Sequence, residues 1–374
     1  MNGYFIFYRD INYEKLNGID KKVISQLETF KDAGINCKLE IMQSNKKDFW
    51  HKLYNTVTCR LPFGNTDPTW RFNPKFNEVD FIYLRRPTSI NYPMLKVLRK
   101  IKKKNPKIKI IMEIPTYPYD DELKSKVKDY PRYLKDIYSR RKLEGLVDRI
   151  AVQNNVDKIF NIPTLNFTNG IRVKEIKPRE VLKTKGINIC AVASMEPWQG
   201  YERVILGLSN YYKNGGNVDV NIYLVGEGNE KATYEKMVNE LNLNDHIHFE
   251  GFLSGKQLER IYSKSDIALD SFGRYKTKNE FSTSLKSREY LAKGLPIVSG
   301  SKIDIINKSF PYYYEFASNS STVDFKKIIE FYHEIYLAGK VKDEIIQEIR
   351  DYAFLVCDMS ISMNEIITYI KKGK

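Results

Sequence analysis

Short apolar runs alternate with amphipathic segments along both halves of the chain, and this alternation constrains the fold more than any other feature. The runs predict strands at residues 4–8, 37–42, 81–84, 108–111, 146–152 and 165–167, and again at 187–193, 220–225, 246–250, 267–269 and 297–298. Apolar residues at helical spacing fill most of the intervals, for example 201–214 and 284–293. Such alternation is typical of parallel sheets with right-handed crossovers. The sequence therefore predicts an α/β fold of two Rossmann-like domains that face each other across a cleft.

A charged stretch with few apolar residues separates the two series of strands. The chain has 374 residues, more than one ordinary core requires. We expect an N-terminal domain over residues 1–173, a linker over 174–185 and a C-terminal domain over 186–345. Residues 346–374 are expected to form helices that return to the N-terminal domain.

The net charge of +15 lies entirely in the first half of the chain. Residues 1–180 contain 36 Lys+Arg and 21 Asp+Glu (36 − 21 = +15), whereas residues 181–374 contain 25 of each. A lysine-rich genome would bias both halves alike, so a functional basic face is favoured over a compositional bias. No groove-reading motif accompanies the charge, so we expect no nucleic-acid partner.

The basic residues concentrate at 96–109 and again at 124–142. Within the first segment, Met94, Leu95, Leu98 and Ile101 form an apolar stripe bordered by Lys and Arg. Such a stripe suits either a helix at a headgroup interface or a helix packed on its own sheet. We favour the second arrangement, with the cations directed at an anionic membrane surface.

The sequence gives little support for a metal-binding, a redox-active or a membrane-spanning protein. No apolar run approaches the roughly 20 residues that cross a bilayer, and the first residues lack the basic region of a signal peptide. The four cysteines are far apart, and His246 and His248 alternate within an expected strand. Asp120, Asp121 and Glu122 suit an exposed helix start better than a metal site. We expect a cytoplasmic chain, peripheral at the inner face of the membrane, that needs no metal or cofactor.

The segment from Phe281 to Val298 carries the strongest chemical signal. Three hydroxyl residues precede a helix that is expected to end at Gly294, namely Ser282, Thr283 and Ser284. They are good N-cap residues, and the free N–H groups of the first turn form an anion site. Glu289 lies further along, where its carboxylate could accept hydrogen bonds from a ribose diol. An ordinary capped helix with a surface glutamate is about equally compatible with these residues alone.

This segment resembles the donor-site helix of the retaining glycosyltransferases of family four, which have two Rossmann-like domains. The match rests on Glu289-Tyr-Leu-Ala-Lys-Gly-Leu-Pro-Ile-Val298. Further motifs follow the family's order: Ser194-Met-Glu-Pro-Trp-Gln-Gly-Tyr-Glu-Arg203, Leu224-Val-Gly-Glu-Gly228, Phe249-Glu-Gly-Phe-Leu253 and Leu258–Asp266. The resemblance implies that the donor is bound by Glu289, Ser282, Thr283, Ser284, Leu285, Gln199, Gly226, Phe252 and Arg203.

The N-terminal half resembles the family more loosely. Asn17-Gly18-Ile19 is similar to a glycine loop over the donor, which makes Gly18 a donor-binding candidate. Glu113-Ile-Pro-Thr-Tyr-Pro-Tyr-Asp120 is similar to a motif of bacterial surface-polysaccharide transferases. It implies acceptor contacts by Glu113, Tyr117 and Tyr119, and a catalytic role for Asp120. A loop made rigid by its prolines is the alternative interpretation.

Several family positions are occupied by other residue types. The arginine and lysine that clamp the pyrophosphate in the family correspond here to Ser194 and Gln199. The sugar-binding glutamate corresponds to Phe281, with Glu280 one residue out of register. Four cations could replace the missing charge: Lys286, Arg288, Arg203 and Arg274. We expect Lys286, nearest the helix N-terminus, to do so, with Glu280 as its catalytic partner.

The resemblance implies transfer of a sugar from a nucleoside-diphosphate donor to a glycan or lipid-linked acceptor, with retention of configuration. The expected setting is synthesis of bacterial surface polysaccharide or glycoconjugate. The lost family residues keep open an alternative, a catalytically degenerate partner that stabilises or recruits an active enzyme.

Overall fold

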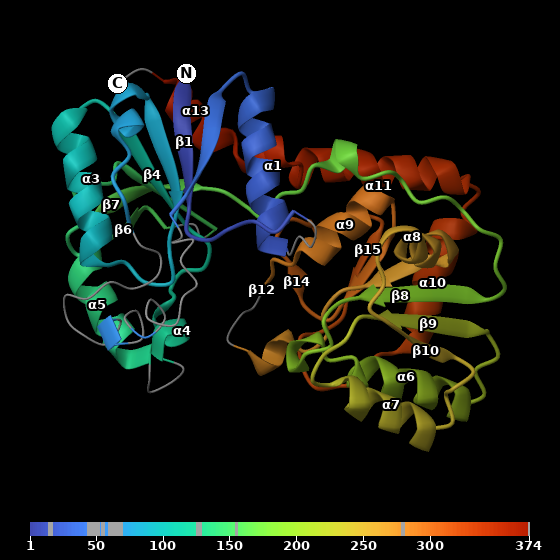
Figure 1. The fold of residues 1–374 in the computed structure, drawn as a ribbon. Coiled ribbons are helices and arrows are strands. Elements are labelled where there is room, and N and C mark those ends of the chain that lie inside the picture. The colour runs from blue at the N-terminus through green and yellow to red at the C-terminus, as the bar shows by residue number, and fades with distance from the viewer. Residues whose placement is uncertain are drawn as a thin grey trace. The chain divides into compact units, whose positions relative to one another are not determined.

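In the computed structural model, the chain divides into two compact units (Figure 1). The structure describes residues 1–13, 18–42, 53, 57–58, 70–124, 129–153, 156–277 and 281–372. Unit 1 comprises Met1–Thr168 and Ser362–Lys374, and unit 2 comprises Asn169–Ile361. The predicted α/β class with two Rossmann-like halves is confirmed.

Unit 1 is built on a seven-stranded sheet in the order β2-β1-β3-β4-β5-β7-β6. Its strands are β1 (Asn2–Phe7), β2 (Asn36–Ile41), β3 (Phe81–Arg85), β4 (Lys109–Ile114), β5 (Arg149–Val152), β6 (Lys158–Ile159) and β7 (Ile162–Asn166). Its helices are α1 (Gly18–Asp32), α3 (Tyr92–Lys104), α4 (Asp120–Lys124), α5 (Tyr130–Arg140) and α13 (Asn364–Lys371). Neighbouring strands are parallel except β6 and β7.

Helix α3 shows how the basic half separates its apolar and charged faces. Asn91 caps the helix through a 3.0 Å bond from the Met94 N–H to its side-chain oxygen. The predicted stripe of Met94, Leu95, Leu98 and Ile101 is buried, as expected for a helix that covers its own sheet. The cations of this helix are exposed except Lys102, which is half-buried: Lys96, Arg99, Lys100, Lys103 and Lys104. This part of the prediction is confirmed.

Unit 2 is built on a six-stranded, fully parallel sheet in the order β10-β9-β8-β11-β13-β15. The strands are β8 (Ile187–Val192), β9 (Val220–Val225), β10 (Ile247–Gly251), β11 (Ile267–Leu269), β13 (Ile297–Ser299) and β15 (Tyr313–Glu315). The helices include α6 (Glu202–Lys213), α7 (Lys231–Glu240), α8 (Gly255–Lys264), α9 (Leu285–Lys293), α10 (Phe325–Tyr336) and α11 (Lys342–Val356). This is the 3-2-1-4-5-6 strand order of the Rossmann fold. Successive strands are added on one side of β8 as far as β10, and then on its other side from β11 onward.

The unit boundaries differ from the predicted domain limits. Unit 2 begins at Asn169, so it includes the stretch 174–185 that was expected to be a free linker. Backbone bonds from Arg179 N–H to Lys293 O and from Leu182 N–H to Ser263 O fix that stretch to α9 and α8. Helix α11 also belongs to unit 2, and only residues from Ser362 onward return to unit 1.

No helix within the described part of the chain is both long and apolar enough to span a membrane.

Candidate functional site

The reversal point between β8 and β11 is where a Rossmann sheet offers a ligand site, at the carboxyl ends of its strands. β8 and β11 pair directly, with Ala268 opposite Cys190. The turn after β8 carries Gln199, and Asp270 follows β11 at once. These two side chains therefore come to the same edge of the sheet.

Glycines allow the loops at this edge to pack backbone against backbone. Gly226 has a positive φ of 131°, and a Cβ there would overlap the carbonyl oxygen of Ala193. Gly200, with φ of 65°, approaches the backbone of Phe272 and Gly273 in the same way. Gly226, predicted as a donor-binding residue, is thus required for the close contact of two neighbouring loops.

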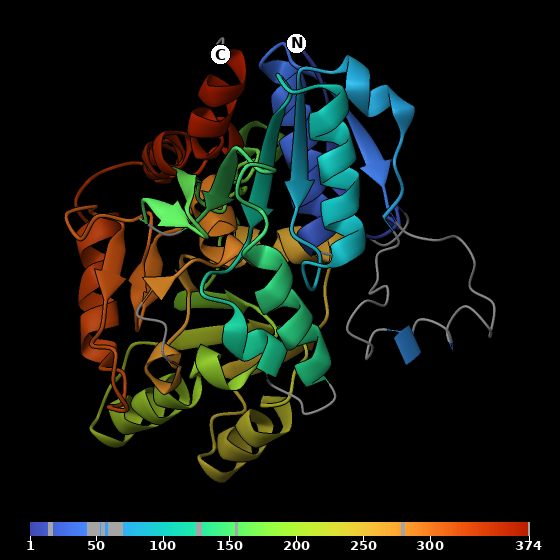
Figure 2. The same ribbon diagram turned by 90° about the vertical axis from the view of Figure 1, so that its left-hand side faces the viewer.

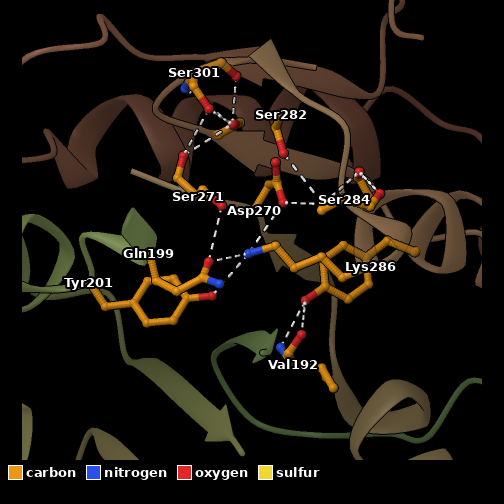
Figure 3. A network of polar contacts seen from close by, with 12 residues as sticks. Val192, Gln199, Tyr201, Asp270, Ser271, Ser282, Ser284, Lys286 and Ser301 are labelled. Carbon is orange, nitrogen blue, oxygen red and sulfur yellow. Dashed lines mark hydrogen bonds and ion pairs between the residues drawn. The ribbon is translucent and has the colours of Figure 1, made fainter. Parts of the chain in front are cut away.

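Lys286 lies between Gln199 and Asp270 (Figure 3). Its Nζ donates to Gln199 Oε1 at 2.6 Å and lies 3.2 Å from Asp270 Oδ1. The Tyr201 hydroxyl is 3.4 Å from the same nitrogen, and Ser271 Oγ donates to Gln199 Oε1 at 3.0 Å. The structure thus brings together two predicted residues, Gln199 and Lys286, around one that the sequence did not single out.

The charges of this pair depend on each other because both side chains are withdrawn from water. Burial by itself raises the pKa of the Asp270 carboxyl, but Lys286, with Ser282 and Arg274, holds that pKa below its usual range. Burial lowers the pKa of the Lys286 ammonium, and Asp270 opposes this effect. Asp270 thus counteracts the effect of burial on the Lys286 ammonium.

Among the described residues, no side chain caps the N-terminus of α9. Ser284 is the N-cap residue, yet its Oγ donates to Asp270 Oδ1 at 3.1 Å and makes no capping bond. Ser282 is fully buried, Thr283 is exposed and Leu285 is the first helical residue. The first-turn N–H groups are therefore left for an anion, with Lys286 in the same turn.

Glu289 lies three residues beyond Lys286 on α9 and lines a cavity of about 610 Å³ within unit 2. Its Oε1 accepts a 3.1 Å hydrogen bond from the Tyr262 hydroxyl. Lys256, Arg260 and Lys293 also line the cavity, together with residues of the 175–182 stretch. A volume of this size is in the range of small-molecule sites, and residues three apart on a helix are neighbours.

Two of the candidate cations are used elsewhere, which corrects their expected role. The Arg203 guanidinium is buried and donates to the carbonyl oxygens of Ser321, Phe272 and Ala317 at 2.6, 2.7 and 3.0 Å. Arg288 is fully buried, and its Nη2 donates to both carboxylate oxygens of Asp304 at 2.6 Å. Both arginines hold the fold of unit 2 together.

Arg274, the remaining candidate cation, is close enough to the pair for its charge to lower the pKa of both Asp270 and Lys286. It opens a short 3-10 turn, Arg274–Lys276, and its buried Nε has no hydrogen-bond partner among the described residues. Glu280, the predicted catalytic partner, lies outside the described residues. Phe252 follows β10 with 78% of its surface exposed.

The predicted acceptor residue Glu113 proves to be the centre of a buried charge cluster in unit 1. It pairs across the sheet with Arg85, whose Nη1 is 2.5 Å from Glu113 Oε1. Helix α1 contributes Lys22 at 3.4 Å and Gln26 at 2.9 Å, and the Tyr83 hydroxyl donates at 2.7 Å. Burial opposes ionisation, but these partners lower the pKa of Glu113 to about 2. With no exposed surface, Glu113 cannot contact an acceptor as expected.

The remaining predicted residues of unit 1 form an aromatic and charged group after β4. Tyr119 is buried and donates to Asp136 Oδ2 at 2.8 Å, while Tyr117 stays partly exposed with its ring against Tyr119. Asp120 opens α4, as expected for a helix start, and accepts a 2.5 Å bond from Arg140. Its carboxylate is thus ion-paired, which argues against the catalytic role. Gly18 begins α1, where a Cβ would meet nothing within 4 Å.

The described residues contain no group of three or more His, Cys, Asp or Glu side chains placed to hold a metal ion.

Comparison with known proteins agrees with this geometry. Residues 173–306, which contain Gln199, Asp270, Lys286 and Glu289, match the family described as Glycosyl transferases group 1. No curated protein matches the chain in sequence. Among solved structures, a glycosyltransferase from Rickettsia africae ESF-5 has a TM-score of 0.62 at 14% identity, covering 100% of this chain and 99% of that one.

Two further structures share the fold along the whole chain. The lipopolysaccharide outer core galactosyltransferase WaaB in its apo form has a TM-score of 0.58 at 13% identity, with 100% of both chains covered. Anabaena Alr3699/HepE in complex with UDP and glucose has a TM-score of 0.56 at 12% identity, with 99% of both covered. The match over residues 173–306 and the fold of the whole chain together support the glycosyltransferase superfamily for this protein.

Proposed function

We propose that this protein transfers a sugar from a nucleoside-diphosphate donor bound at the β8–β11 edge of unit 2. The observation that carries the proposal is the Lys286 ammonium, whose side chain is 10% exposed, beside the N-terminus of α9, which no side chain of the described residues caps. A departing diphosphate needs positive charge and N–H donors in a site with little water, and this edge supplies both. Arg274 is the second cation within reach.

Glu289 is proposed to accept hydrogen bonds from the ribose of the donor. It stands about one helical turn from Lys286, a separation suited to a nucleoside and its phosphates. The cavity that Glu289 lines lies along α8 and the 175–182 stretch, and Lys286 and Asp270 are not part of its lining. The complex of Alr3699/HepE with UDP and glucose is consistent with a uridine nucleotide as the first donor to test.

The acceptor is proposed to be a glycan or a lipid-linked sugar of bacterial surface polysaccharide or glycoconjugate, and transfer is proposed to retain the anomeric configuration without a metal ion. The basic surface of unit 1, including the exposed Lys103 and Lys104, would attract the enzyme to the anionic inner face of a membrane. Lys102 is less suited to that role because it pairs with Asp148 at 2.6 Å.

The second candidate function, a degenerate partner without activity, is favoured by Gln199, which replaces a family cation. The contact between Gln199 and Lys286 weighs against it, because an ammonium still stands at that place.

Donor hydrolysis separates the two candidates. The purified chain is incubated with UDP-glucose and other nucleotide sugars, with and without EDTA, and release of the nucleoside diphosphate is measured. Release that needs Lys286 supports the transferase. Nucleotide binding without release by any donor would favour the degenerate partner.

A further inference from the structure

Helix α5 fully buries polar side chains and exposes large apolar ones, although its Tyr133 packs partly buried against the core of unit 1. The residues that it buries are all polar: Lys135, Asp136 and Ser139. Its exposed positions are Tyr130, Leu134 and Tyr138, which show 52%, 52% and 57% of their surface. A helix at the surface of a globular protein normally packs the apolar side inward.

The inward polar side chains are satisfied, so this orientation is built into the fold. Asp136 accepts from the Ile90 N–H at 2.7 Å and from the Tyr119 hydroxyl at 2.8 Å. Lys135 donates to the carbonyl oxygen of Thr58 at 2.8 Å. Turning α5 around would break these buried bonds, so its apolar face must stay outside.

The three outward residues are spaced at i, i+4 and i+8 and form a continuous row, which we call the α5 stripe. Single exposed apolar side chains need no explanation, but a row of three on a helix that buries none of them indicates a partner. In Figure 2, α3 lies in front of the strands of unit 1, and α5 lies below α3 on the side that faces the viewer.

Cations border the α5 stripe. Lys142 Nζ lies 3.8 Å from the centre of the Tyr138 ring. The positive charge of Arg99 on α3 is near enough to help lower the pKa of Tyr138. Residues 124–142 contain eight Lys+Arg but only two acidic residues. Of these two, Asp129 is paired with Arg132 at 3.3 Å and Asp136 faces inward.

We propose that the α5 stripe inserts into the interface of an anionic membrane. Tyrosine and leucine within a border of Lys and Arg match the headgroup boundary, where aromatic rings and cations are both favoured. Like charge disfavours a second copy of this chain as the occupant. The inference adds an apolar anchor to the electrostatic attraction between the basic surface of unit 1 and the membrane. It rests on the proposed function only for the reason that the enzyme would be held at a membrane.

The first test measures co-sedimentation of the full chain with phosphatidylcholine vesicles containing about one third phosphatidylglycerol. Changing Tyr130, Leu134 and Tyr138 together to Ser leaves the charge intact, and we expect at least a tenfold loss of binding. The matched control changes the exposed Leu337, Val341 and Leu355, all in unit 2, to Ser and should bind like the wild type. Because insertion is apolar, part of the wild-type binding should persist at high salt.

A second measurement keeps the inference testable if the triple variant folds poorly. Tryptophan in place of Leu134 should shift its emission to the blue on adding vesicles and be quenched by brominated lipid, whereas tryptophan in place of Leu355 should not. If the emission of the tryptophan at position 134 is blue-shifted before vesicles are added, the chain itself covers the stripe, and the proposal is overturned. Wild-type-like binding of the triple variant would also overturn it, as would a dimer in sedimentation that this variant abolishes.

The outcome is independent of the transferase assay. Donor hydrolysis should be equal in the wild type and the triple variant, since no stripe residue belongs to the β8–β11 edge. Vesicle binding without any hydrolysis would reject the proposed function alone, and hydrolysis without stripe-dependent binding would reject the membrane anchor alone.

Discussion

Lys286 Nζ lies 3.2 Å from Asp270 Oδ1, and Asp270 is completely buried at the carboxyl end of β11. The pair holds the Lys286 ammonium, balanced by the Asp270 carboxylate, in a site largely withdrawn from water. Ser284 bonds Asp270 and therefore does not cap α9. A buried pair of this kind is costly unless further bonds satisfy it. Ser284 donates to Asp270 Oδ1 and Gln199 accepts from Lys286, but Asp270 Oδ2 has no hydrogen-bond partner among the described residues. The arrangement is more readily explained by a ligand that uses the ammonium than by stability alone.

Replacing Lys286 by Ala should lower donor turnover about a hundredfold, because a charge that meets the leaving diphosphate is lost. Lys286→Ala also leaves the buried Asp270 carboxylate without its counterion, so its turnover must be compared in folded protein. Replacing Arg203 by Ala should lower stability without a loss of turnover in the folded protein. Three carbonyl oxygens lose their donor, which we expect to cost roughly 3 kcal/mol and to lower the melting temperature by roughly 6–12 °C. Turnover at a temperature where both variants are folded, with calorimetric melting, distinguishes them. A turnover loss in Arg203→Ala equal to that in Lys286→Ala would contradict the assignment.

Exchanging two residues tests whether the position of the ammonium matters more than the residue that carries it. Lys286→Gln alone should lose activity, and adding Gln199→Lys should restore a large part of it, because the two side-chain ends are 2.6 Å apart. Gln199→Lys alone places two ammonium groups together and should lower stability. Single-turnover donor hydrolysis is the measurement. Failure of the double variant to exceed Lys286→Gln, despite a wild-type melting curve, would show that Gln199 and Lys286 do not share one ligand.

Replacing Glu289 by Ala should weaken nucleotide binding with little change in stability. Loss of a charge-assisted hydrogen bond to the ribose costs roughly 1.5–3 kcal/mol, or roughly 10- to 150-fold in Kd. Titration calorimetry with UDP measures the effect, and Glu240→Ala on the exposed face of α7 is the control. Unchanged affinity in Glu289→Ala would remove this residue from the donor site.

The sequence predicts the framework of the site because that framework depends on local patterns. Alternating strands and helices predict the two parallel sheets, and the hydroxyl run before α9 predicts where its N-terminus lies. The orientation of α3 also follows, since apolar residues at helical spacing can be read directly from the chain. Asp270 could have been noticed as an acid at the end of a buried strand.

Pairings between distant residues could not be predicted in this way. Gln199 and Lys286 are 87 positions apart, and nothing local shows that they touch. Arg203 was a candidate cation for the donor site, yet its guanidinium is surrounded by carbonyl oxygens of two separate segments, at Phe272 and at Ala317 and Ser321. In α5 the periodicity is plain, but the buried partners of Asp136 decide which face turns inward. The local sequence pattern predicts the helices and strands, whereas polar contacts between distant residues decide what each charged side chain does.

The last prediction concerns the pH dependence conferred by Glu113. Its pKa is lowered from 4.5 to about 2, so it stabilises the fold fully above pH 4.5 and loses that contribution as the pH falls towards 2. Glu113→Gln should destabilise the chain by about 3 kcal/mol at neutral pH, since Arg85 and Lys22 keep their charges without the counterion. The difference from the wild type should shrink between pH 4.5 and 2, where the wild-type carboxyl becomes neutral as well. Urea unfolding at several pH values measures this, with the exposed Glu28→Gln on α1 as the control. A difference that stays constant or grows on acidification would show that the buried cluster does not hold Glu113 ionised.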